Sequence, residues 1–220
     1  GGRLHTDGLR VYYNAGVGAS RWLMQAPVTG GDSVRLECAL RVPVVYDILA
    51  SRNQLLIVDA VRNYMPDPLW SLSTMGGNPR PVGGLEASDA AWTSDGQRIV
   101  FASGNDVFEA RSDGSGSRRL LTAPARVLFP RLSPDGRRLR FTLIETDGPA
   151  LWEAGGDGSD PHPLLPGWNA AQGRWTPDGR HYVFRARRDG ELALWVLSEK
   201  GRWPWSRMRS PVPMRLTTGP

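Results

Sequence analysis

The sequence predicts an all-β fold made of about five repeated four-stranded units, and three observations support this prediction. A motif of the form Trp/Leu-Ser/Thr-x-Asp-Gly recurs along the chain at a nearly constant spacing. Apolar residues occupy fixed places after each copy of the motif. The 220 residues include 26 glycines and 18 prolines, which indicates many turns, and no window of the chain has helical periodicity.

The recurring motif has three strong copies and two weaker copies that precede them. The strong copies are Trp92–Phe101, Leu132–Phe141 and Trp175–Phe184, and the weaker ones are Leu4–Tyr13 and Leu49–Val58. Their turn residues are spaced 45, 43, 40 and 43 residues apart: Gly8, Asn53, Gly96, Gly136 and Gly179. Glycine and asparagine both tolerate a positive φ, so this column predicts a backbone requirement.

The strands on either side of each turn are predicted from the apolar columns. Residues three and five places after the turn are apolar in every copy, a period of two that is typical of a β-strand. A second turn column follows in each repeat: Gly30, Gly76, Gly114, Gly158 and Gly201. Each repeat therefore contains two hairpins, or four strands.

Four strands in 40–45 residues are typical of one blade of a β-propeller. We expect five blades, the last with a long hairpin insertion at 201–213. Their predicted limits are 1–41, 42–86, 87–126, 127–169 and 170–220. The chain starts almost on one repeat's turn and stops where another blade would begin. We therefore expect these blades to be a fragment of a six- to eight-bladed ring.

The repeat resembles a known family. It has the general pattern Trp/Leu-Ser/Thr-Pro-Asp-Gly-Arg before an apolar strand, followed by Leu-Trp and then Asp-Gly-Ser. This pattern is similar to the TolB-like propeller repeat, a relative of the WD-type repeat. The resemblance covers nearly the whole chain and is strongest over 87–200. It implies a propeller of the kind found in periplasmic Tol-system proteins, peptidase accessory domains and bacterial signalling proteins.

The run 151–220 is most similar to the C-terminal propellers of large bacterial proteins. Those proteins carry an N-terminal winged-helix DNA-binding domain or a protein-kinase domain. The resemblance therefore implies such a domain in the full-length protein.

No catalytic constellation is recognisable in the sequence. The turn aspartates are interpreted as caps of their own hairpins rather than as a carboxylate cluster: Asp7, Asp95, Asp135 and Asp178. His5, His162 and His181 fall in different blades without the spacing of metal ligands. Cys38 is the single cysteine, which excludes an internal disulfide framework. We expect no metal site and no cofactor.

The best binding candidates lie in the insertion 201–213, which contains Trp203, Trp205 and Arg207. Extra loop length combined with Trp and Arg favours a binding surface, and a longer exposed hairpin is the alternative. Arg140 is the other candidate, because it stands where the other copies carry Tyr12, Ile57, Val100 and Val183. We expect it to find a partner such as Glu145 or Glu153, or to reach solvent.

The net charge is +5. The basic stretches Arg137-Arg138 and 185–188 alternate with apolar strand positions and lack interleaved aromatic residues, so we expect solvated rims and no nucleic-acid binding. No apolar run is long enough to span a membrane. The sequence leaves the compartment open, with a periplasmic or extracytoplasmic one favoured over the cytoplasm.

The sequence therefore predicts a non-catalytic propeller for interaction or sensing, within a larger bacterial signalling or envelope protein. Its partner would be a protein or a small molecule bound on a propeller face. Two alternatives stay open. One is an accessory propeller of a peptidase. The other is a glycoside-active five-bladed propeller, in which Asp47 and Asp89 are the plausible acids of the innermost strands.

Overall fold

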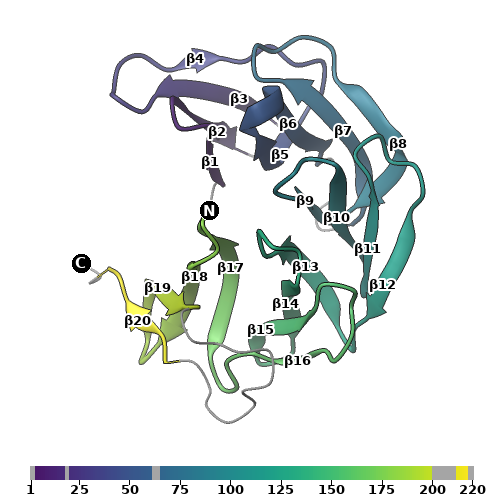
Figure 1. Cartoon of the computed structure of the whole chain (residues 1–220). Coiled ribbons are helices and arrows are strands. Elements are labelled where there is room, and N and C mark those ends of the chain that lie inside the picture. Colours follow the sequence, from purple (N-terminus) through teal and green to yellow (C-terminus); the bar gives the residue numbers. More distant parts are fainter. Residues whose placement is uncertain (1–2, 18–19, 61–64, 200–211, 218–220) are drawn as a thin grey trace. The chain divides into compact units, whose positions relative to one another are not determined.

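The computed structural model describes residues 3–17, 20–60, 65–199 and 212–217 (Figure 1). Within these ranges the regular secondary structure is made of β-strands apart from one short 3-10 helix, η1 (Ala50–Arg52). The strands form five four-stranded antiparallel sheets, and in each sheet the strands are hydrogen-bonded in chain order. The predicted all-β propeller architecture of five four-stranded blades is confirmed.

The first two sheets contain eight strands. The first sheet is made of β1 (Leu4–Thr6), β2 (Arg10–Val17), β3 (Ser20–Pro27) and β4 (Val34–Arg35). The second sheet is made of β5 (Pro43–Leu49), β6 (Gln54–Asp59), β7 (Asp67–Ser73) and β8 (Arg80–Ala87).

The other three sheets repeat this order. The third contains β9 (Asp89–Trp92), β10 (Arg98–Ser103), β11 (Asp106–Arg111) and β12 (Arg118–Thr122). The fourth contains β13 (Arg126–Leu132), β14 (Arg138–Glu145), β15 (Gly148–Gly155) and β16 (His162–Pro163). The fifth contains β17 (Asn169–Trp175), β18 (His181–Arg188), β19 (Glu191–Ser198) and β20 (Met214–Arg215).

The chain divides into two compact units, and each is described separately. The first unit is Gly1–Ile99 with Ala110–Ser117, and the second is Val100–Glu109 with Arg118–Pro220. In the first unit, β5 contacts the first strands of the neighbouring sheets, β1 and β9. In the second unit, β17 contacts β13, β14 and β15. First strands therefore lie beside first strands within each unit.

The hairpin after each first strand is built as the motif predicts. In the third sheet, the backbone N–H of Gln97 donates to Asp95 Oδ1 (2.9 Å), and the N–H of Arg98 donates to the Thr93 hydroxyl (3.0 Å). The fourth and fifth sheets repeat these bonds at Ser133–Arg138 and Thr176–His181. Asn53 has a φ of 52°, so the turn column is a backbone requirement as predicted.

A backbone hydrogen bond ties the second turn of a sheet to its first hairpin. In the third sheet the N–H of Ser112 donates to the Gln97 carbonyl (2.9 Å). In the fourth, Gly156 donates to Arg137 (2.8 Å), and in the fifth, Glu199 donates to Arg180 (2.8 Å). The second strand of a sheet therefore begins beside the point where the third strand ends. In the fifth sheet this bond fixes the backbone of Glu199.

Apolar side chains from neighbouring sheets share one core in each unit. In the first unit the shared cluster joins the first and second sheets: Tyr12, Leu23, Leu36, Val45, Leu55, Ile57 and Leu72. In the second unit it joins the fourth and fifth sheets: Leu151, Leu164, Leu165, Ala170, Tyr182, Phe184, Ala186 and Leu197. Burial of these side chains is the main source of stability between adjacent sheets.

Candidate functional site

The first candidate residue, Arg140, lies between the fourth and fifth sheets, and its side chain is fully buried. Its Nε donates to Glu153 Oε2 (2.7 Å), and its Nη2 lies 2.8 Å from Glu199 Oε1. Glu153 faces Arg140 across the β14–β15 ladder, as expected for a cross-strand partner. The predicted pairing with Glu153 is confirmed, whereas Glu145 instead accepts a bond from Trp152 Nε1 (3.2 Å).

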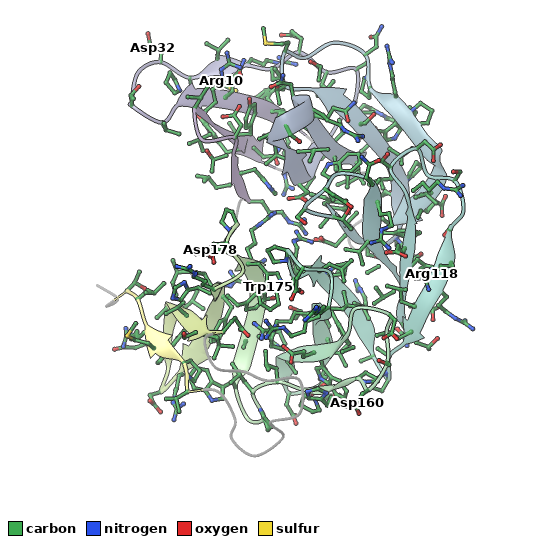
Figure 2. All side chains as sticks on the ribbon, viewed as in Figure 1. Arg10, Asp32, Arg118, Asp160, Trp175 and Asp178 are labelled. Atoms are coloured by element: carbon green, nitrogen blue, oxygen red, sulfur yellow. The ribbon has the colours of Figure 1, made fainter. Side chains whose placement is uncertain are left out.

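Two aromatic rings of the fifth sheet enclose the Arg140 guanidinium. Its central carbon lies 4.2 Å from the ring centre of Trp175 and 4.4 Å from that of Tyr182. Trp175 ends β17, and Asp178 follows it in the hairpin turn (Figure 2). Burial raises the pKa of Tyr182 to about 12, although the positive charge of Arg140 acts in the opposite direction. The phenol therefore stays neutral beside the cation.

Arg138 extends this ion network and corrects one expectation. Its guanidinium hydrogen-bonds Glu199 and lies 4.9 Å from the ring centre of Trp175. The sequence placed Arg137-Arg138 together on a solvated rim, which holds for the exposed Arg137 but is wrong for the partly buried Arg138. Glu199 thus receives two arginines from the neighbouring sheet, and its partners connect the fourth sheet to the fifth.

The inner-strand acids, Asp47 and Asp89, are also engaged in contacts between sheets. Asp47 Oδ2 accepts the backbone N–H of Trp92 (3.0 Å), which joins β5 to β9. Asp89 is fully buried, and its Oδ2 lies 2.6 Å from Arg3 Nη2. Burial and the nearby Asp89 charge raise the pKa of Tyr46, which lies under the Arg3 guanidinium. These contacts do not favour the glycoside-active alternative.

An open cavity of about 410 Å³ lies on the fifth sheet and offers a different kind of chemistry. It is lined by the β16–β17 connection at Trp168 and by the end of β18 at Arg187 and Arg188. The Arg188 guanidinium lies 4.5 Å from the ring centre of Trp168. Arg187 donates from Nη1 to the Gly190 carbonyl (2.8 Å), which fixes it beside the hairpin. Both arginines are exposed.

Trp168 is held firmly although the repeat columns do not include it. Its ring meets Trp195 edge-on, with ring centres 4.9 Å apart, and lies 6.3 Å from Phe184. The indole therefore packs against the core while Arg188 lies over the ring. The sequence signal for this site is an aromatic residue off the columns, directly after a turn with glycine at positive φ (Gly167, 77°).

Trp203, Trp205 and Arg207, the remaining binding candidates, lie outside the described residues. Within the described part of the chain, no group of three or more His, Cys, Asp and Glu side chains could hold a metal ion. The same residues include no helix that is long and apolar enough to cross a membrane.

Comparisons with known proteins agree on the architecture. No protein-family model matches the chain. The Tol-Pal system protein TolB of Anaeromyxobacter sp. (strain K) is 33% identical over 89 residues, which is 40% of this chain and 20% of that protein. TolB of Anaeromyxobacter dehalogenans (strain 2CP-C) is 34% identical over the same length. The match thus spans about a fifth of the length of these relatives.

Solved structures extend the likeness to nearly the whole chain. A putative TolB from Agrobacterium tumefaciens aligns with a TM-score of 0.73 at 18% identity, covering 90% of this chain and 76% of that one. The fold is that of a TolB-like β-propeller. TolB from Acinetobacter baumannii gives 0.70 at 12% identity over 87% of this chain and 49% of that one. Puromycin hydrolase gives 0.61 at 19% identity over 98% and 39%.

The TolB-like fold is consistent with a protein-interaction module. Several buried charged side chains form contacts between sheets, as in the pairs Arg140–Glu199 and Arg3–Asp89. The arginines around Trp168 are exposed at the surface and are not part of these buried contacts between sheets. The fifth sheet therefore provides the candidate functional site of this TolB-like propeller.

Proposed function

We propose that this chain is a non-catalytic interaction or sensing module of a larger bacterial signalling or envelope protein, and that its fifth blade binds a protein partner. The observation that carries the proposal is the exposed Arg188 stacked on Trp168 beside a 410 Å³ cavity. Trp and Arg are enriched among the residues that dominate binding energy at protein interfaces. The rigid packing of Trp168 on Trp195 lowers the entropy cost of binding there.

The partner's chemistry follows from the charge of this surface. Arg187 and Arg188 present two guanidinium groups. Asp189 Oδ2 lies 3.9 Å from Arg188 Nε, and both side chains of this pair are exposed. Such a pair contributes little. Glu191 faces Arg188 across the hairpin, but its carboxylate accepts a hydrogen bond from Arg215 (2.7 Å). Both cations therefore stay available. The proposed partner therefore has carboxylates around an apolar or aromatic centre. The insertion 201–213, with Trp203, Trp205 and Arg207, belongs to the same predicted blade and would extend the surface.

Site-specific photocrosslinking in the native cell tests this proposal. A photoreactive residue replaces Arg188 in the full-length protein, and the matched control replaces Arg119, an exposed arginine of the third sheet. We expect one adduct at position 188 that disappears when Arg187→Glu is added, because charge reversal repels an acidic partner. Equal adducts at both positions, or none at position 188, would contradict a binding surface on the fifth blade.

An accessory role to a peptidase is a second candidate, favoured by the alignment of puromycin hydrolase over 98% of this chain. In that case the full-length protein carries a nucleophilic serine in another domain. A fluorophosphonate probe that labels the full-length protein, with the label mapped outside residues 1–220, would support this candidate over a signalling module. A winged-helix or kinase domain upstream, and no labelling, would support the signalling module.

A further inference from the structure

A second cavity, of about 310 Å³, lies in the first unit and is distinct in chemistry from the surface on the fifth blade. It is bordered by β3, by β4 and by the segment that joins the first sheet to the second. Three arginines line it: Arg21, Arg35 and Arg41. All three are exposed, and no carboxylate is among the described residues that line the cavity. The opening is therefore strongly basic.

The residues beneath this cavity are apolar but present little surface to it. Leu23 and Leu36 are 1% and 3% exposed and belong to the core that joins the first two sheets. Trp22 forms a side wall and is 39% exposed, with the Arg35 guanidinium 5.9 Å from its ring centre. A ligand that contacts both the Trp22 ring and the arginines has an apolar body and an anionic end.

The wall formed by the connecting segment is anchored in place. The N–H of Gly77 donates to the Glu37 carbonyl (2.9 Å), and Asn14 Nδ2 donates to the Pro43 carbonyl (2.5 Å). A Cβ at Gly76 would come within 2.9 Å of the same Glu37 carbonyl, so the close approach requires glycine. These contacts fix the segment that forms this wall, which lowers the cost of ordering it when a ligand binds.

Glu37 does not neutralise the arginines. Its Oε1 lies 3.7 Å from Arg35 Nε, and both side chains are exposed, so this pair contributes little. Guanidinium groups bind carboxylates through paired, charge-assisted hydrogen bonds. Three such groups beside the exposed Trp22 ring match one carboxylate attached to an apolar group.

We propose that this cavity binds a small organic carboxylate with an apolar body, held by Arg21, Arg35 and Arg41 over the ring of Trp22. The volume is at the lower end of ligand sites and accommodates a group the size of one apolar side chain. A free aromatic acid and the C-terminus of a peptide that ends in an apolar residue present this same chemistry. The proposal does not rest on the function proposed for the fifth blade.

Cys38 supplies a reporter, because it lines the cavity and is the single cysteine of the sequence. Burial raises the pKa of its thiol, so alkylation by iodoacetamide is slow near neutral pH and is measured at about pH 8.5. The probes are 3-phenylpropionate and its uncharged amide, the peptide Gly-Gly-Phe with a free or an amidated C-terminus, and inorganic phosphate. The alkylation rate at Cys38 is followed by mass spectrometry of the peptide that contains it.

We expect 3-phenylpropionate to slow alkylation and its amide to have no effect. The double variant Arg35→Gln/Arg41→Gln should weaken this protection at least about tenfold, because each guanidinium gives a charge-assisted bond. The matched control is Arg80→Gln, an exposed arginine of β8 in the same unit, which should retain full protection. Circular dichroism checks that the variants stay folded.

The remaining probes distinguish a small free acid from a peptide C-terminus as the ligand, and they can overturn the proposal. Protection by free Gly-Gly-Phe and not by its amide identifies a chain terminus as a ligand, and protection by 3-phenylpropionate alone identifies a small acid. Equal protection by acid and amide would overturn the role of the arginines. Protection by phosphate at the same concentration would contradict the requirement for an apolar body. The absence of protection by either carboxylate would contradict the binding site itself.

Discussion

Arg140 of the fourth sheet and Glu199 of the fifth form a buried ion pair, with Arg140 Nη2 2.8 Å from Glu199 Oε1. Neither side chain is more than 3% exposed. A buried pair of this kind adds little net stability compared with apolar residues of the same size, but removing one partner leaves a charge without compensation. The pair therefore constrains which neighbour the fourth sheet can pack against.

Replacing Arg140 with methionine should destabilise the protein by about 3 kcal/mol, because Glu153 and Glu199 would stay buried and lose the cation that they share, while Glu199 keeps Arg138. The measurement is the free energy of unfolding from urea denaturation. Arg137→Met is the matched control, since Arg137 is exposed in the adjacent turn, and it should change stability by less than about 0.5 kcal/mol. Equal effects of the two variants would show that the buried network is not required.

Gly173→Ala should cost about 3 kcal/mol, because a Cβ at this position in β17 would overlap the ring of Tyr182. The test is a double-mutant cycle with Tyr182→Leu, which removes the ring. Gly173→Ala should cost much less in the Tyr182→Leu background than in the natural chain. An additive result would mean that the backbone conformation, rather than the ring, excludes a side chain at Gly173.

Asn53→Ala should destabilise the second sheet by about 1 kcal/mol, whereas Asn53→Gly should leave stability within about 0.5 kcal/mol of the natural chain. The reason is the φ of 52°, which asparagine and glycine adopt at a lower cost than alanine. Thermal and urea unfolding of the two variants measure the difference. The prediction is wrong if alanine and glycine have the same effect.

Asp95 should contribute a pH-dependent part of stability. The Thr93 hydroxyl and the Gln97 backbone N–H hydrogen-bond its carboxylate and lower its pKa in the folded protein. The stabilisation is therefore present above the pKa of about 3.9 that aspartate has in an unfolded chain, and it is lost as the pH falls through the lower folded pKa.

The check is the free energy of unfolding between about pH 6 and about pH 2.5 for Asp95→Asn. This variant should show a shallower loss of stability in acid than the natural chain. Asp32→Asn is the control, because Asp32 is exposed in the connection between β3 and β4 (Figure 2). It should keep the natural pH profile, and a shallower profile in this control would assign the effect to net charge.

The repeat made most of the fold predictable. Turn residues recur because each requires a particular backbone conformation, and the alternation of apolar residues follows from the pleat of a strand. The pairing of Arg140 with Glu153 was also predictable, since the two residues face each other on adjacent strands of one sheet. These features depend on residues within one repeat, so the aligned positions of the repeats reveal them directly.

Contacts between sheets were not predictable in the same way. Glu199 directly follows β19, and nothing in the columns relates it to Arg138 or Arg140 of the preceding sheet. Phe129 and Gln172 adopt positive φ values of 55° and 57° at bulges in β13 and β17, although neither residue type favours this conformation. Packing imposes these features, and a single sequence does not record packing partners.

Glu199 pairs with two arginines of the preceding sheet. The fourth and fifth repeats therefore depend on each other, and neither can be exchanged for another repeat independently. The third repeat carries Val100 at the position of Arg140, so a copy of the third repeat placed before the fifth would leave Glu199 facing an apolar strand. Gene duplication can lengthen such an array freely only where the join is apolar on both sides. Here any rearrangement of repeats at the junction between the fourth and the fifth must keep these two repeats together.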